Sequence, residues 1–105
     1  MAMDQTVEDA KMFKALSDPK RLAILRQLRS GEKCACVLLE PMDLTQSGLS
    51  YHMKILCDSG LVVCRQEGKW THYRISESGK TLALARLSAV LSTDSKQSSD
   101  RCSCE

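Results

Sequence analysis

The sequence lacks any long apolar run, since no segment approaches the roughly 20 apolar residues that a membrane-spanning helix needs. The opening residues 1–5 have neither the basic start nor the apolar stretch of a secretory signal peptide. We therefore expect a cytoplasmic protein with no membrane partner. The chain also lacks a glycine-rich phosphate-binding loop, its carboxylates are scattered, and no base is evident beside a cysteine, so we expect no enzyme.

The composition suits one small domain. With 105 residues, 43% of them hydrophobic, the apolar core is small, and dimerisation would help it. Six cysteines without an export signal are expected to be reduced thiols, available to metals or oxidants. The net charge of +2 is spread unevenly, because residues 11–33 hold seven basic residues against two acidic ones. That excess suits either contact with phosphates or a solvated helical face.

Apolar periodicity and cap residues predict the order of the elements. Helices are expected over 4–16, from Pro19 until the Arg29-Ser30-Gly31 stop, over 33–40, from Thr45 to Gly60, and over 77–91. Two β-prone runs, 61–66 and 70–75, are joined by three residues that include Gly68, which predicts a hairpin. The fold class is therefore mainly α: a winged helix-turn-helix of five helices and one β-hairpin wing. The domain spans 4–91, and a flexible, serine-rich tail spans 92–105.

Four motifs in this order closely resemble the ArsR/SmtB family. They cover residues 16–25, 44–54, 59–62 and 68–75, and the resemblance extends over about residues 7 to 91. It implies a dimeric bacterial repressor that leaves DNA when it binds its metal or metalloid. Cys34-Ala35-Cys36 is similar to the Cys-x-Cys element of the family's arsenite and antimonite sensors. In this way the resemblance points to trivalent arsenic or antimony as the inducer.

The fourth helix is expected to be the recognition helix that enters the major groove of operator DNA. Its outward side chains can bond to base edges or phosphates, although an ordinary solvated face would look the same. On the hairpin, Lys69 at the tip with Arg65 and Arg74 on the strands could reach the minor groove or the backbone. One module buries little DNA, so we expect a homodimer, joined by its first and last helices, on an inverted repeat. The candidate contacts are Gln46, Ser47, Ser50, Tyr51, Lys54, Arg65 and Lys69.

The candidate inducer site starts from Cys34 and Cys36. Trivalent arsenic and antimony are soft ions that favour thiolates, usually three. If both residues lay on a regular helix, about 200° of rotation would separate their side chains. We therefore expect the first turn of this helix to unwind or distort on binding, and to reorient the recognition helix. The alternative is that both are small buried hydrophobes.

A third sulfur has to come from elsewhere. Arsenite sensors of this type often carry another cysteine one helical turn after the pair, but this chain has Leu39 there. Cys102 and Cys104 form a second Cys-x-Cys in the tail, and the chain from Leu91 can reach up to roughly 35 Å. An external thiol or hydroxide is the other way to complete the site. Cys57 and Cys64 are interpreted as core or surface thiols.

Other inducers and functions stay open at this point. Cadmium or lead could bind the thiols. The zinc site of the family's zinc sensors is missing, because residues 77–91 contain no His and no Asp. A thiol redox-sensing repressor is the first alternative function. A thiol metal-buffering protein that does not bind DNA is the second.

Overall fold

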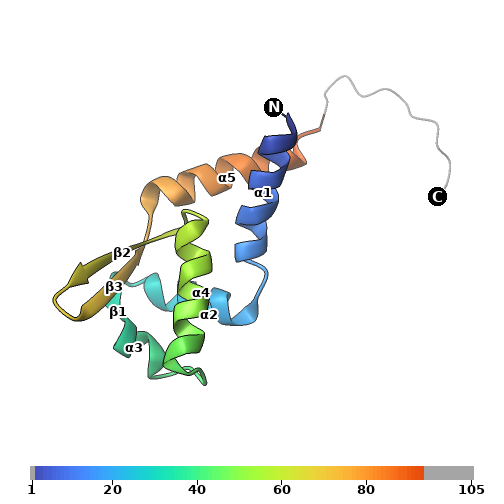
Figure 1. The fold of residues 1–105 in the computed structure, drawn as a ribbon. Helices are drawn as coiled ribbons and strands as arrows, with labels where there is room; N and C mark the ends of the chain where they lie inside the picture. Colours follow the sequence, from blue (N-terminus) through green and yellow to red (C-terminus); the bar gives the residue numbers. More distant parts are fainter. Residues whose placement is uncertain (1, 94–105) are drawn as a thin grey trace.

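The predicted order of elements is confirmed in the computed structural model, which describes residues 2–93 (Figure 1). Within those residues the chain forms five helices and one small antiparallel sheet. The elements are α1 (Ala2–Ala15), α2 (Pro19–Leu28), β1 (Lys33–Cys34), α3 (Ala35–Leu39), α4 (Gln46–Asp58), β2 (Val62–Glu67), β3 (Trp70–Ile75) and α5 (Glu77–Leu91).

Three helices, α2, α4 and α5, begin where the predicted cap residues stand, whereas α3 begins at Ala35, two residues later than expected, without a side-chain cap. Asp18 accepts a hydrogen bond from the backbone N–H of Lys20 at 2.7 Å, and Pro19 takes the first helical position. Thr45 accepts from the N–H of residue 48, and Ser76 accepts from that of residue 79, both at 2.9 Å. These side chains supply the bonds that the first turn of a helix cannot make for itself.

The sheet differs from the expected hairpin in two respects. Glu67 pairs with Trp70, so the connection has two residues rather than three. Gly68 fills the first of them with φ +64°, a conformation that suits glycine and the tight turns between antiparallel strands. In addition, β1 pairs with β3 and makes the strand order β1-β3-β2. Sequence patterns missed β1 because it is two residues long.

The core lies around α4, which contacts α2, α3 and β2. Its apolar residues recur at helical spacing, and the fully buried side chains come from all of these elements. They are Ile24, Leu38, Leu49, Met53, Leu56 and Val62. Figure 1 shows α1 and α5 together at one end of the molecule and α3 with the start of α4 at the other.

Two further expectations concern a membrane-spanning helix and the division of the chain into domain and tail. Within residues 2–93, no helix is long and apolar enough to cross a membrane. The division into a domain, 4–91, and a tail, 92–105, stays a prediction because residues 94–105 lie outside the described part of the chain.

Candidate thiol site and nucleic-acid interface

Cys34 and Cys36 do not lie on one regular helix, so the expected separation of their side chains is wrong. Cys34 ends β1, where it pairs with His72, and it has the extended conformation φ −76°, ψ 149°. Cys36 lies in the first turn of α3. The change from strand to helix between them brings the two Sγ atoms to 3.1 Å. The two sulfurs therefore meet without any unwinding of α3, so binding of one ion by both does not require that helix to distort.

The two thiols differ in acidity because they share one hydrogen bond. The Cys36 thiol, together with nearby backbone N–H groups, stabilises the thiolate of Cys34 and lowers its pKa. The same interaction raises the pKa of Cys36, since its proton is held by Cys34 and a second negative charge is disfavoured. Cys34 is half-buried and Cys36 is exposed. The arrangement is a pair of contacting thiols, one more acidic than an ordinary cysteine and the other exposed, which suits binding of a soft ion.

Cys57 and Cys64 differ from this pair. Cys57 is half-buried near the end of α4, and burial, followed by the neighbouring Cys64, raises the pKa of its thiol to about 11. Cys64 is exposed on β2, opposite Tyr73. A thiol that resists ionisation is a weak nucleophile and a weak ligand at neutral pH. Their interpretation as core and surface thiols agrees with these positions.

The pair fits two of the three ligands of a trivalent metalloid. Two sulfurs bound to one ion at about 2.3 Å lie roughly 3.3 to 3.8 Å apart, so the observed 3.1 Å needs a shift of only a few tenths of an ångström. Within residues 2–93 no group of three His, Cys, Asp or Glu residues could hold a metal ion. The predicted ligands Cys102 and Cys104 lie outside the described residues.

The outward face of α4 is as predicted in its exposure. Leu49, His52, Met53 and Leu56 are buried on its inner face. The opposite face carries short polar groups near the N-terminus, then an aromatic side chain and a cation. Its exposed residues are Gln46, Ser47, Ser50, Tyr51 and Lys54. Lys54 also forms an exposed ion pair with Asp58 at 3.3 Å. This face has the geometry of a helix that can enter a major groove.

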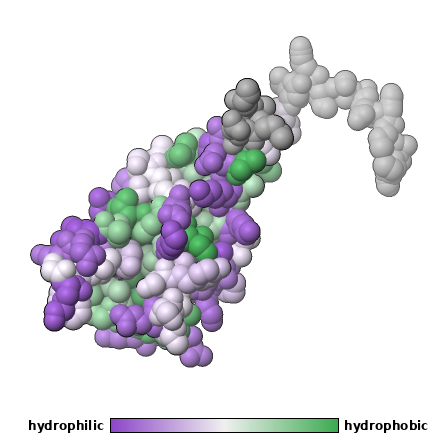
Figure 2. Space-filling view, in the orientation of Figure 1, coloured by the Kyte–Doolittle hydropathy of each residue, from purple (hydrophilic) through white to green (hydrophobic). Residues whose placement is uncertain are grey.

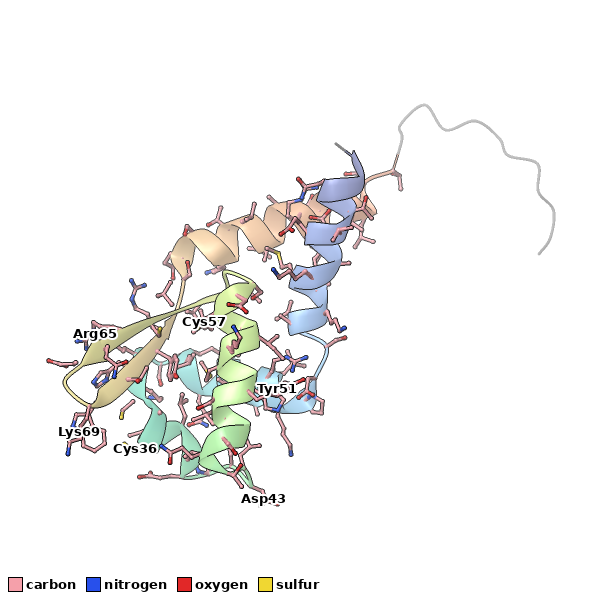
Figure 3. All side chains as sticks on the ribbon, viewed as in Figure 1. Cys36, Asp43, Tyr51, Cys57, Arg65 and Lys69 are labelled. Carbon is pink, nitrogen blue, oxygen red and sulfur yellow. The ribbon has the colours of Figure 1, made fainter. Side chains whose placement is uncertain are left out.

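The two candidate contacts on the wing differ. Lys69 is exposed at the hairpin tip and forms no ion pair within residues 2–93. Arg65 is bound by two carboxylates: Nη2 donates to Glu32, and Nη1 donates to Glu67 at 3.0 Å. The bond from Arg65 lowers the pKa of Glu32, which keeps that carboxylate charged. Figure 3 shows Arg65 and Lys69 on the wing, on the same side of α4 as Cys36.

Two functional positions were missed by sequence reasoning. Arg21, counted there in a basic cluster, is buried and donates to the carbonyl of Ala15 at 2.7 Å and to His52 Nδ1 at 3.0 Å. It joins α1 and α2 to α4. Its spacing of three from the buried Ile24 could have revealed this. Glu32, one of the two acidic residues in 11–33, was assigned no role, and nothing local indicates its distant partner.

The comparisons with known proteins agree with this fold. The family described as "Bacterial regulatory protein, arsR family" matches residues 18–63. The chain is 41% identical over 81 residues to the arsenical resistance operon repressor of Bacillus subtilis, covering 71% of this chain and 77% of that protein. It is 37% identical over 98 residues to the arsenical resistance operon repressor of Staphylococcus aureus, covering 93% and 89%.

A solved structure agrees as well. The ArsR-like transcriptional regulator from Rhodococcus sp. RHA1 superposes with a TM-score of 0.73 at 26% identity, over 86% of this chain and 83% of that one. The chain therefore belongs to the ArsR family of bacterial regulatory proteins, and it is a transcriptional repressor rather than an enzyme.

Proposed function

We propose that this repressor binds an inverted-repeat operator as a homodimer and leaves it when trivalent arsenic or antimony binds Cys34 and Cys36. The 3.1 Å contact between their sulfurs, with one thiol made more acidic, is the observation that carries the proposal. The names of the Bacillus subtilis and Staphylococcus aureus relatives support an arsenical as the inducer. Cadmium and lead, which also favour thiolates, are the alternative inducers.

The DNA half of the proposal rests on α4 and the wing. Gln46, Ser47, Ser50 and Tyr51 would face base edges, since amide and hydroxyl groups can donate to and accept from them. Lys54 and Lys69 would contact phosphates, as would the N–H groups of Arg65 that its two carboxylates leave free. Contacts of this kind fix orientation on the duplex and make the affinity depend on salt.

The dimer half rests on apolar surface at the other end of the molecule. Five large apolar residues of α5 are 45% to 68% exposed to solvent, and Val7 of α1 is 60% exposed. The residues on α5 are Leu82, Leu84, Leu87, Val90 and Leu91. Apolar surface interrupts the polar surface at this end in Figure 2. A two-fold contact between copies would cover it, because large exposed apolar patches usually mark interfaces.

The third ligand is proposed to come from the tail. Cys102 or Cys104 of either subunit would supply a sulfur that residues 2–93 do not offer. If so, replacing both by Ser should weaken arsenite binding at least tenfold, since even the loss of an outer-shell partner of a metal site costs about 10–100-fold in affinity. Unchanged arsenite affinity in a direct binding titration would mean that an external thiol or hydroxide, and not the tail, supplies the third ligand.

The test is a titration of the reduced protein on its own upstream DNA. Arsenite, antimonite, cadmium and zinc are added separately while anisotropy of a labelled operator reports release, with a phosphine as reductant because a dithiol would compete for arsenic. We expect release by arsenite or antimonite at the lowest concentrations and none by zinc. Persistent binding in saturating arsenite and antimonite would contradict the proposal.

A redox sensor is the second candidate, because the same contact favours it. Peroxide would take two electrons from the two thiols, giving a disulfide and two molecules of water, and the sulfurs would close from 3.1 Å to about 2.05 Å. Peroxide without arsenic separates the two candidates. The metal-buffering interpretation without DNA binding finds no support in the family to which the chain belongs.

A further inference from the structure

The sensor strand is part of the sheet that forms the wing. Cys34 of β1 lies directly opposite His72 of β3, and His72 lies directly opposite Arg65 of β2. Residues that are directly opposite one another in an antiparallel sheet share a face. A row of three side chains therefore leads from one ligand thiol to one candidate DNA contact.

An ion pair reinforces this row. Glu32 stands two residues before Cys34, and its carboxylate binds the Arg65 guanidinium across β3, 33 residues away in the chain. His72 lies between them, with Nδ1 4.0 Å from Glu32 and Nε2 3.6 Å from Glu67. Both acidic residues contact Arg65, but only Glu32 is joined through the backbone to β1.

We propose that Glu32 transmits the state of the thiol pair to the wing: ion binding displaces β1, Glu32 moves with it, and Arg65 changes its position relative to DNA. This inference rests on the proposed function. It replaces the expected unwinding of α3 with a smaller movement, since coordination needs the sulfurs to separate by a few tenths of an ångström. A two-residue strand, paired on one side only, offers little resistance to such a shift.

The geometry of Arg65 makes the coupling selective. Its Nη1 and Nη2 groups each bind a carboxylate, and the donor edges in use cannot hold a phosphate at the same time. Movement of Glu32 therefore changes both where the guanidinium points and how much of it a phosphate can reach. Allosteric coupling requires an interaction whose free energy differs between two states of the protein. The ion pair between Glu32 and Arg65 would differ in this way between the two positions of β1.

The test compares two variants that remove the same charge from the same arginine. Glu32→Gln breaks the link to β1, and Glu67→Gln is the matched control on β2. For each protein, operator affinity is measured with and without saturating arsenite, and the ratio of the two dissociation constants gives the coupling. We expect Glu32→Gln to reduce this ratio at least fivefold and Glu67→Gln to keep it within about twofold of the wild type, within the range of ordinary allosteric effects.

Two further measurements exclude a general structural effect. Arsenite affinity from direct titration should stay within about threefold of the wild type in both variants, since neither carboxylate is a proposed ligand. Arg65→Lys keeps the charge but lacks the two-pronged geometry, so it should also lose coupling.

Wild-type coupling in either Glu32→Gln or Arg65→Lys would overturn the inference, as would an equal loss of coupling in Glu67→Gln. If wild-type protein holds the operator in saturating arsenite, the proposed function itself fails and the inference falls with it. If arsenite releases the wild type and Glu32→Gln equally, only the inference fails.

Discussion

Replacing Arg21 by Met tests whether one buried guanidinium holds the recognition helix in place. Arg21 is 7% exposed and donates to the carbonyls of Ala15 at 2.7 Å and Lys14 at 3.1 Å, and to His52 Nδ1 at 3.0 Å. Hydrogen bonds from a charged donor contribute about 1.5–3 kcal/mol each, but bonds from one group are not additive. Met fills much of the same volume, so we expect a total loss of about 3 kcal/mol.

Urea denaturation at a fixed protein concentration measures this loss. For an m-value of about 1.5 kcal/mol per M, the midpoint falls by about 2 M. The matched control is Arg26→Met in the same helix, where the side chain is exposed and forms no ion pair or side-chain hydrogen bond within residues 2–93. The control should stay within about 0.5 kcal/mol. A cost below about 1 kcal/mol for Arg21→Met, or equal costs in both variants, would refute the reasoning.

Three other predictions concern packing, acid stability and thiol reactivity. A Cβ at Gly79 would collide with the backbone carbonyl of Gly60, so Gly79→Ala should lose about 2 kcal/mol in thermal unfolding despite its better helix propensity; an unchanged midpoint would contradict this. Arg86 of α5 donates to the carboxylate of Asp9 in α1 at 2.9 Å, and this bond holds the pKa of Asp9 below its ordinary 3.8. Its contribution is present above that pH and is lost as pH falls below it, so Asp9→Asn should flatten the acid limb of the stability curve, and parallel limbs would argue against the pair. At pH 8, iodoacetamide should modify Cys57, whose pKa burial raises to about 11, far more slowly than Cys34, whose pKa is lowered, as peptide mass spectrometry would show; equal rates would rule out the difference in ionisation.

The predictable features are those with local causes. The inner face of α4 repeats at helical spacing, and Thr45 caps its first turn through its own side chain, so sequence alone predicted both the helix and its exposed face. The hairpin followed in the same way from two β-prone runs around Gly68. These features need no knowledge of distant residues.

The thiol geometry could not be predicted for the opposite reason. Cys34 is extended because β1 pairs with β3, which lies nearly 40 residues further along the chain. Tertiary pairing overrode the local helical pattern, and this changed a separated pair into a contacting one. The bond between Glu32 and Arg65 has the same long-range origin. Fold prediction was therefore more successful than prediction of the site's geometry.

The central claim is that arsenite releases the repressor from DNA by binding Cys34 and Cys36. Replacing one cysteine pair at a time by Ser tests this claim most directly. The operator-release titration with arsenite is repeated under phosphine reduction for Cys34→Ser with Cys36→Ser, and for the matched control Cys57→Ser with Cys64→Ser. We predict that the first variant still binds the operator but is not released by arsenite, because it lacks the contacting, more acidic pair. The control should be released at about the wild-type concentration. Release of the first variant at wild-type arsenite concentrations would contradict the account.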